Sequence, residues 1–376
     1  MASDQIQKRL RNQYDILWHL QVNGPAQRSH LSRALDIRKT SVTNIVNDLL
    51  ERGILAAEDP GSIRSRVALD AGSFHALSAH VTSSEILFSR VYTNGRLQDE
   101  QKVPLSSGNQ PDLVLNALAE GFAVMRATMA PRILGIGVSM PGFIDPESGI
   151  NVRAVNLDDW DQVPIRSQLS ERMETPVVVE NDVRCQLWSH TWFEQHAEIS
   201  DNVIYLHVHE GISCAVMMHG RLITGENASA GEIGQIRPSG DRETLEVSSS
   251  IPALIEKISG AYPDLDIQAV GQIPAAMQQE AGVHQLRDEA AERIIAVLSG
   301  LVAALDPQAI VLGTDDRELT EALAPLLDKH LGEALNDLHQ RSVQVRGADE
   351  VHTSSLRGIG GLVIHKAFRS GEFSIA

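Results

Sequence analysis

The sequence predicts an α/β protein in which an N-terminal winged helix-turn-helix precedes a larger body of strands and helices. Within residues 1–72, helical apolar patterns are followed by two strand-like runs that flank an arginine-containing loop. From Phe74 onward, apolar runs typical of strands alternate with helical patterns. We therefore expect two domains, residues 1–72 and residues 73–376.

Size and composition narrow the class of protein. A chain of 376 residues is long enough for two or three domains with ample core. Its two cysteines, Cys185 and Cys214, exclude a disulfide framework and indicate a reducing compartment. There is no apolar run of membrane-spanning length, and the polar start MASDQIQKRL is not a signal peptide. We therefore expect a cytoplasmic protein with no membrane contact.

The charge is unevenly distributed along the chain. A net charge of −17 argues at first against nucleic acid as a partner. Residues 1–70, however, hold ten Lys/Arg against eight Asp/Glu, whereas the other 306 residues hold 22 against 41. An acidic body behind a slightly basic head is expected of a protein that contacts DNA only through its N-terminus.

The first two helices of the head follow from apolar spacing. Residues 5–22 form the first helix, which Asn23-Gly24-Pro25 ends. Ser29 is expected to cap a short second helix. The inward-facing positions are Leu10, Tyr14, Leu17, Trp18 and Val22 in the first helix, and Leu31, Ala34 and Leu35 in the second.

The third helix follows a turn at Asp36-Ile37 and has two distinct faces. Its apolar stripe consists of Val42, Ile45, Val46, Leu49 and Leu50, and its polar face of Lys39, Thr40, Thr43, Asn44 and Asn47. In a helix-turn-helix, such a helix enters the major groove. Asn pairs with adenine and Thr contacts a thymine methyl, whereas Arg38 and Lys39 suit phosphate or guanine. Because Arg38 stands where a Ser or Thr cap is usual, the start of this helix stays open.

A wing follows the third helix. Gly53 ends the helix, strands are expected at residues 54–55 and 67–69, and the loop between them carries Arg64 and Arg66, which suit the DNA backbone or minor groove. The alternative is a helical oligomerisation module whose polar face meets only water. Because a wing and a helix-turn-helix occur together, the sequence favours DNA binding.

In the body, the sequence predicts strands and helices in alternation. Two strands with an Asn94-Gly95 turn come first, then a helix over residues 111–129 and a buried strand ending at a proline-glycine turn. Residues 175–193 are a strand running into a helix, and residues 202–222 are a β-hairpin. A long helix over residues 286–305, the strand AIVLGT and a closing helix LRGIGGLVIHKAF complete the body.

Residues 220–246 hold two acids in a glycine-dense loop. Glu232 lies between Gly231 and Gly234, and Glu246 follows a short loop later. Glycine lets a backbone approach a ligand closely, and a carboxylate accepts two sugar hydroxyls in fixed geometry. The alternative for this segment alone is a surface turn whose acids provide solubility.

Together these motifs resemble the ROK family of repressors, open reading frames and sugar kinases. The matching segments run in family order over nearly the whole chain: VSMPGFIDPESG, VNLDDW, VENDVRC, the hairpin, GENASAGEIGQI, LDPQAIVLG and the glycine-rich final helix. The resemblance implies an actin-like, ribonuclease H-like sugar-kinase fold of two lobes. The small lobe would span about 73–185 plus about 355–370, and the large lobe about 186–354. The head makes the chain similar to the family's xylose- and N-acetylglucosamine-type repressors.

The resemblance also implies a sugar site. In the family's kinases, the position of Asp182 is the general base for the sugar hydroxyl, and here we expect it to serve ligand binding. Asn181 and Asp182 alternatively cap the helix that follows, a role compatible with sugar binding. Gln235 stands where the family has a sugar-contacting histidine. The implied sugar-binding residues are Asn156, Asn181, Asp182, Glu232, Gln235 and Glu246.

Parts that phosphoryl transfer and zinc binding need are missing. Residues 79–85 contain no Asp and no Gly where the family has its first phosphate loop, only Gly211 remains of the second, and Gly313-Thr314 replaces a double glycine. Gln235 and the cysteine-free segment 236–246 replace the family's structural zinc ligands. We therefore expect no catalysis, no metal and no cofactor.

The sequence thus predicts a sugar-responsive transcriptional regulator, a repressor of carbohydrate metabolism genes, with double-stranded operator DNA as its partner. A sugar or sugar phosphate would change the spacing of two heads in a homodimer or homotetramer and so lower operator affinity. The alternative is an ATP-dependent sugar kinase with a vestigial head. The sequence does not specify which sugar binds, whether it is phosphorylated, or which operator is recognised. It also leaves open whether the protein is a dimer or a tetramer, and a repressor or an activator.

Overall fold

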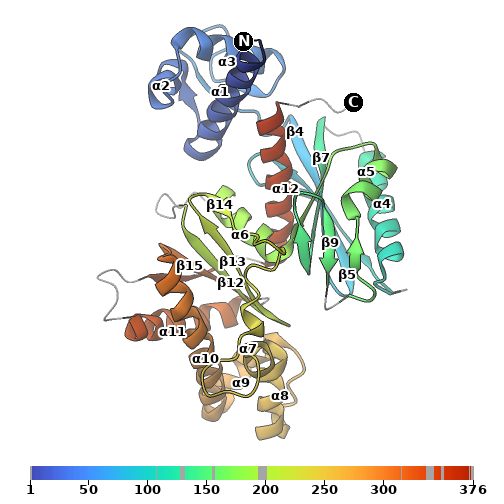
Figure 1. The fold of residues 1–376 in the computed structure, drawn as a ribbon, viewed down its shortest axis with the longest axis vertical. Coiled ribbons are helices and arrows are strands. Elements are labelled where there is room, and N and C mark those ends of the chain that lie inside the picture. Colours follow the sequence, from blue (N-terminus) through green and yellow to red (C-terminus); the bar gives the residue numbers. More distant parts are fainter. Residues whose placement is uncertain are drawn as a thin grey trace. The chain divides into compact units, whose positions relative to one another are not determined.

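The computed structural model describes residues 2–106, 108–127, 132–154, 157–193, 201–314, 316–335, 343–348, 351–371 and 373. The chain divides into two compact units, Met1–Gln195 with Leu356–Ala376, and His196–Ser355. The first unit contains the head and most of the closing helix, and the second contains a sheet with its own helices (Figure 1). No helix among the described residues is long and apolar enough to cross a membrane.

The head has the predicted winged helix-turn-helix architecture. Three helices pack beside a small antiparallel sheet with strand order β1-β3-β2. Leu17, Leu31 and Val46 are among its fully buried side chains. The elements are α1 (Ala2–Asn23), β1 (Ala26–Gln27), α2 (Arg28–Ala34), α3 (Lys39–Glu51), β2 (Leu55–Ala57) and β3 (Arg66–Leu69).

Three details of the head differ from the prediction. Val22, expected to face inward near the end of α1, is 45% exposed. Ser29 does not cap α2, because the helix begins at Arg28, two residues earlier than a Ser29 cap would place it, with Gln27 in the cap position and no side-chain cap bond. Ala34 is exposed rather than buried, since α2 is only seven residues long and Leu31 alone fills its buried face. Arg38 is the N-cap of α3 and also makes no side-chain cap bond.

The body of the first unit is built on a five-stranded sheet with order β11-β7-β4-β5-β6. β7 lies parallel to β4 and β11, while β4, β5 and β6 are antiparallel neighbours, so the carboxyl ends of β7 and β11 share one edge. β6 was not predicted; five consecutive exposed residues give it no apolar signal. The strands are β4 (Phe74–Val81), β5 (Glu85–Tyr92), β6 (Leu97–Pro104), β7 (Arg132–Met140) and β11 (Val177–Asn181).

A second, three-stranded antiparallel sheet with order β10-β9-β8 follows β7. Buried side chains of its strands, including Ile144 and Val163, join those of α4 and α5 in one hydrophobic core with the larger sheet. The elements are α4 (Pro111–Ala127), β8 (Phe143–Asp145), β9 (Ile150–Arg153), β10 (Asp161–Val163) and α5 (Ile165–Met173).

Two helices, α6 (Asp182–Phe193) and α12 (Val351–Ser370), pack together closely because of glycines. A Cβ on Gly358 would lie 1.8 Å from the backbone oxygen of Cys185, and one on Gly137 of β7 would lie 2.7 Å from Ile359. These contacts give the glycines of the closing helix a packing role: α12 approaches both α6 and the sheet at backbone distance.

The second unit contains a five-stranded sheet with order β14-β13-β12-β15-β16 and a large buried core. The predicted hairpin, long helix and following strand are present as β12–β13, α10 and β15. Its strands are β12 (Val203–Val208), β13 (Ile212–Met218), β14 (Arg221–Leu222), β15 (Ala309–Gly313) and β16 (Gln344–Gly347). Its helices are α7 (Leu245–Ser249), α8 (Ile251–Ala261), α9 (Ile273–Gln279), α10 (Ala281–Leu305) and α11 (Arg317–Leu335), with short 3₁₀ turns at Ile233–Gln235, Pro263–Leu265 and Val270–Gln272.

Candidate functional site

The predicted DNA-contacting face of α3 is open to solvent. Arg38, Lys39, Thr40, Asn44 and Asn47 are exposed, while the buried side chains of the helix lie on its opposite face. Thr43 is half-buried, and its hydroxyl donates to the Lys39 carbonyl oxygen at 2.9 Å. Apart from Thr43, the polar row therefore presents donors and acceptors outward, as a base-reading helix requires.

The two wing arginines differ in their contacts. Arg64 is exposed. Arg66 donates two hydrogen bonds, of 2.9 and 3.3 Å, to the carbonyl oxygen of Pro25 and lies 3.6 Å from a Glu58 carboxylate oxygen. Arg66 therefore fastens β3 to the turn after α1, and Arg64 is the more available of the two for an external phosphate.

The structure adds Arg28, which sequence reasoning missed. Its guanidinium donates to the Asn47 side-chain oxygen at 3.2 Å and to the Ile63 carbonyl oxygen at 3.4 Å. It thereby joins α3 to the wing, where the Ile63 side chain is 67% exposed. No sequence signal pointed to this role, because Arg28 lies 19 residues from Asn47 and 35 from Ile63.

Of the sugar-binding candidates, Asn181 and Asp182 lie in the first unit, where β11 ends and α6 begins. The Asn181 side-chain oxygen accepts from the Arg184 N–H at 3.1 Å, so Asn181 caps α6. Its side-chain nitrogen donates to the Asp182 carboxylate at 2.9 Å and to the Gly142 carbonyl oxygen at 3.2 Å. The pair is thus held at the carboxyl end of β11, an edge where α/β folds place ligands. Asn156 lies outside the described residues.

A buried ion pair lies directly beside the Asn181–Asp182 pair. Glu180, one residue before Asn181, accepts from Arg184 at 2.7 Å, and both side chains are buried. Glu180 also accepts from the Asn181 backbone N–H at 2.7 Å. Removing one partner of a buried ion pair strongly destabilises a fold, because the other charge is left buried and uncompensated. These contacts therefore fix the direction of the β11–α6 turn.

The other three candidates lie in the second unit. Gln235 donates to the Glu246 carboxylate at 3.4 Å, so these two side chains are neighbours. Glu232 precedes them at the start of the 3₁₀ turn and is half-buried. Gly231 places this loop against β13: its φ is +101°, and a Cβ there would lie 1.8 Å from the Cys214 carbonyl oxygen. Only glycine fits, so the loop conformation is required by packing.

The positions of the expected phosphate loops are filled in this chain. At the β12–β13 turn, the Glu246 carboxylate accepts the Ile212 backbone N–H at 3.2 Å, and a Cβ on Gly211 would lie 2.7 Å from that carboxylate. Gly313 is packed against Tyr205, whose hydroxyl would lie 2.1 Å from a Cβ there. A nucleotide phosphate would need the same Ile212 N–H as a donor, and the Glu246 carboxylate that occupies it would also repel the phosphate charge.

No group of three or more His, Cys, Asp or Glu within the described part of the chain is arranged to hold a metal ion. Burial raises the pKa of the Cys214 thiol to about 12, with the nearby Glu232 carboxylate adding to the effect. Burial likewise raises the pKa of Cys185. Both thiols are therefore protonated at neutral pH and are poor metal ligands. The absence of zinc stays a prediction.

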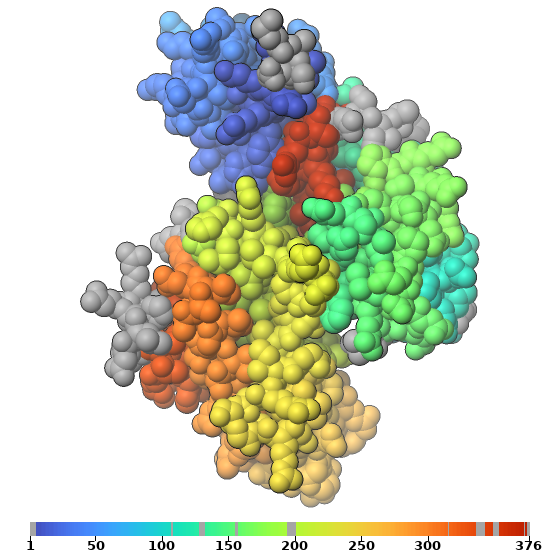
Figure 2. Space-filling view, in the orientation of Figure 1, coloured from blue at the N-terminus to red at the C-terminus, as the bar shows by residue number. Residues whose placement is uncertain are grey.

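An aromatic cluster connects the head to the rest of the first unit. Trp18 of α1 packs edge to face on Trp192 of α6, with ring centroids 4.9 Å apart. His365 of α12 lies 5.0 Å from Trp188 and 5.4 Å from Trp192, and shares a 2.9 Å hydrogen bond with the Tyr14 hydroxyl. Figure 2 shows α12 beside the head. Sequence analysis assigned Tyr14 and Trp18 only to helix packing and so missed this connection.

Further contacts join the head to the same unit. Arg52, at the end of α3, donates to the Gly371 carbonyl oxygen at 3.3 Å, and its guanidinium lies 5.1 Å from the Phe373 ring centroid. Arg132, at the start of β7, donates to the Arg52 carbonyl oxygen at 2.8 Å. The head is therefore held to this unit by hydrogen bonds as well as by the aromatic cluster.

Fold and site together define a class: a winged helix-turn-helix joined to a body with the ribonuclease H-like fold of sugar kinases. Comparison with known proteins agrees. The ROK family model matches residues 83–366, and the MarR family model matches residues 10–64. The chain belongs to the ROK family.

Individual relatives resemble this chain over most of their length. The xylose repressor of Caldicellulosiruptor bescii is 25% identical over 316 residues, covering 76% of this chain and 78% of the relative. The transcriptional dual regulator NagC of Escherichia coli is 23% identical over 331 residues, covering 81% and 80%. The crystal structure of a ROK family transcriptional regulator, a homologue of the E. coli Mlc protein, superposes with a TM-score of 0.85 at 18% identity, over 97% of this chain and 98% of that one.

Proposed function

We propose that this protein is a sugar-responsive transcriptional regulator, a repressor of carbohydrate metabolism genes that works in the cytoplasm without catalysis. The observation that carries the proposal is the exposed polar face of α3 beside a wing, in the same chain as a ROK body. Lys39, Thr40 and Asn44 read base edges in operator DNA, and Arg64 contacts the backbone. The domains are residues 1–72 and 73–376.

The effector is a sugar that binds at the β11–α6 turn of the first unit. At the β11–α6 turn, the side-chain oxygens of Asn181 and Asp182 accept hydrogen bonds from its hydroxyls, because the Asn181 amide nitrogen already donates to Asp182 and Gly142. The resemblance to the family's sugar kinases adds Glu232, Gln235, Glu246 and Asn156 as candidate sugar-binding residues. Sugars are recognised by such fixed, planar hydrogen-bonding groups, and buried polar groups left without a partner are costly.

The residues at the positions of the family's phosphate loops support the absence of catalysis. Phosphoryl transfer requires backbone N–H groups free to hold phosphate oxygens. Here the Ile212 N–H is taken by the Glu246 carboxylate, and Gly313 lies against Tyr205. Asp182, the base position of the family's kinases, keeps its place at the start of α6. That single feature favours the alternative, an ATP-dependent sugar kinase.

Helix α6 is the path from the sugar to the head. Its first residue, Asp182, belongs to the sugar site, and Trp188 and Trp192 near its other end belong to the aromatic cluster that holds Trp18 of the head. A ligand that shifts α6 therefore changes the contact on which α1 rests, and in a homodimer or homotetramer this alters the spacing of the heads. Trp18→Leu should leave sugar binding intact and reduce sugar-induced release of DNA.

Retardation of DNA from upstream of the protein's own gene tests the proposal. The full chain should retard a short duplex from that region, and one sugar of a monosaccharide and sugar-phosphate panel should release it. A chain that retards no duplex more strongly than unrelated DNA of equal length, at the same salt concentration, would contradict the proposed function.

A further inference from the structure

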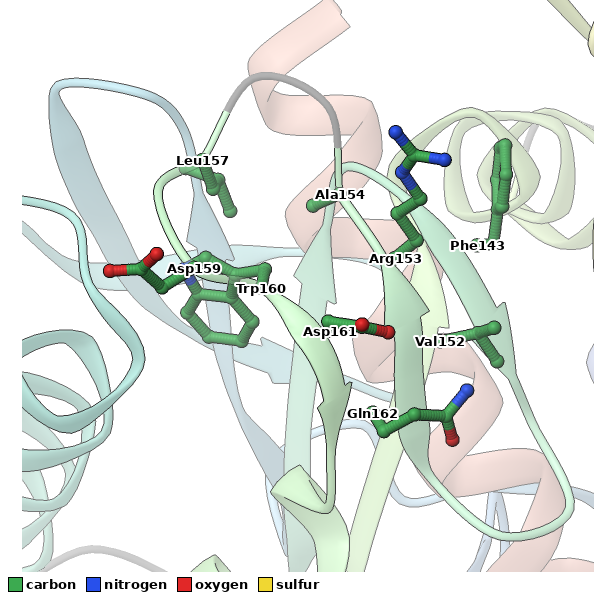
Figure 3. Close-up of a pocket in the computed structure, with 9 residues that line it drawn as sticks. All are labelled: Phe143, Val152, Arg153, Ala154, Leu157, Asp159, Trp160, Asp161 and Gln162. Atoms are coloured by element: carbon green, nitrogen blue, oxygen red, sulfur yellow. The ribbon is translucent and has the colours of Figure 1, made fainter.

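A pocket of about 470 Å³ lies on the three-stranded sheet of the first unit (Figure 3). This volume is within the range of small-molecule sites. None of its lining residues is a candidate sugar-binding residue named above. The lining residues are Phe143, Val152, Arg153, Ala154, Leu157, Asp159, Trp160, Asp161 and Gln162.

The pocket begins next to the Asn181–Asp182 pair. Phe143, which lines it, follows Gly142, whose carbonyl oxygen accepts the Asn181 side-chain N–H at 3.2 Å. Gly142 is pressed against the strand that carries Arg153: a Cβ there would lie 2.6 Å from the Arg153 carbonyl oxygen. Because the pocket adjoins the pair without including it, a ligand that occupies both must be longer than one sugar ring.

The lining has the chemistry of a carbohydrate subsite. Phe143 is only half-buried and offers an aromatic ring to the C–H face of a pyranose. Arg153, Asp159, Asp161 and Gln162 are all exposed and supply guanidinium, carboxylate and amide groups. Figure 3 shows Phe143, Arg153 and Asp161 on the three adjacent strands or at their ends.

The backbone of the pocket is strained. Asp159 has a φ of +63° and Gln162 a φ of +53°, so two non-glycine residues adopt the left-handed conformation within four positions. Such conformations are unfavourable for residues other than glycine and concentrate at ligand sites.

The charge of the lining selects against phosphate. The lining holds two carboxylates, Asp159 and Asp161, and one guanidinium, Arg153, and Asp182 adds a further acid beyond Gly142. A phosphate group carries close to two negative charges at neutral pH, so the excess of carboxylates disfavours its binding here.

We propose that this pocket is a second sugar subsite and that the effector is an uncharged glycoside of at least two units, rather than a phosphorylated monosaccharide. The inference rests on the proposed function, and it assigns a length and a charge to the ligand. One unit binds at Asn181 and Asp182, and the next unit stacks on Phe143 and bonds to Gln162.

Calorimetry with the full chain tests the inference. The probes are xylose, glucose and N-acetylglucosamine; xylobiose, cellobiose, maltose and chitobiose; and glucose 6-phosphate and N-acetylglucosamine 6-phosphate. One disaccharide should bind at least about tenfold more tightly than its own monosaccharide. Phe143→Ala and the milder Gln162→Asn, which keeps a residue that tolerates positive φ, should each remove that advantage and leave monosaccharide affinity unchanged. Gln101→Asn on the exposed strand β6 is the matched control.

The outcomes separate this inference from the proposed function. Equal affinity for a monosaccharide and all its disaccharides, or unchanged disaccharide binding in both variants, overturns the second subsite while sugar binding stands. Tighter binding of a 6-phosphate than of its parent sugar overturns the charge argument and with it the proposed effector. No binding by any probe overturns both the subsite and the sugar-responsive function.

Discussion

Acidification should loosen the aromatic cluster that holds the head, and His365 is the group responsible. Burial, together with the nearby cations Arg369 and Lys366, lowers the pKa of His365 to about 4. The ring accepts or donates a hydrogen bond to Tyr14 and packs on Trp18, Trp188 and Trp192. The folded state therefore holds a neutral imidazole where the unfolded chain, with an ordinary pKa of 6.5, takes up a proton.

The sign and size of the effect follow from proton linkage. Above pH about 6.5 the imidazole is neutral in both states, so His365 costs no stability there. As the pH falls from 6.5 towards 4, the unfolded state binds the proton first, and the free energy of unfolding falls by about 2 kcal/mol by pH 5. His75, whose pKa burial also lowers to about 4, adds a similar loss, so His365 accounts for about half of the total from these two groups.

Urea unfolding at pH 7 and pH 5, followed by tryptophan fluorescence, measures the effect. Three of the four tryptophans lie in the cluster, so the signal reports on it directly. His365→Gln keeps a hydrogen-bonding partner for Tyr14 but cannot titrate, and it should lose about 2 kcal/mol less than the unchanged chain between the two pH values. The exposed His219→Asn is the control. If His365→Gln and the unchanged chain lose equal stability, the assignment of acid sensitivity to His365 is wrong.

Three further predictions concern DNA, ATP and zinc. Asn44→Ala should weaken operator binding by about 1–3 kcal/mol per half-site if Asn44 makes a bidentate base contact, whereas Arg64→Ala should act with less dependence on sequence; a gel-shift titration with unchanged affinity for Asn44→Ala would reject this placement of α3. A coupled assay should detect no sugar-dependent ADP release with hexoses, pentoses or amino sugars, and turnover that Asp182→Asn abolishes would restore the kinase alternative. Metal analysis should find no stoichiometric zinc, and one tightly held zinc per chain would show that the alignment around Gln235 is wrong.

Local patterns in the sequence predicted most of the fold. Apolar spacing located α1, α3, α6 and α10, and turn residues such as Gly53 and Asn94-Gly95 located strand and helix ends. Strand β6 was not predicted, because an exposed edge strand has no alternation of apolar and polar residues. The helices α8, α9 and α11 also lie in segments for which no element was predicted.

The position of the Asn181–Asp182 pair in the fold could be predicted from the sequence, but the contacts of the candidate residues could not. Asn181 and Asp182 follow from a strand that runs into a helix, and the structure shows them hydrogen-bonded to each other. By contrast, the Glu246 carboxylate on the Ile212 N–H joins positions 34 residues apart, and Arg28 joins α3 to the wing over similar separations. Such pairs depend on tertiary packing, which neither periodicity nor local spacing encodes.

The central claim is that a sugar bound at Asp182 controls the head, with Glu232 as a second residue that the family resemblance assigns to sugar binding. Fluorescence anisotropy of labelled operator, measured with and without the sugar that gives the largest thermal shift, tests it most directly. A ligand at one hundred times its dissociation constant stabilises the folded chain by about 2.7 kcal/mol, enough for a clear shift in melting temperature. The sugar should weaken operator binding of the unchanged chain, while Asp182→Ala and Glu232→Ala should bind operator normally and be insensitive to the sugar. If both variants still release the operator on adding that sugar, the sugar does not act through these residues, and the account is wrong.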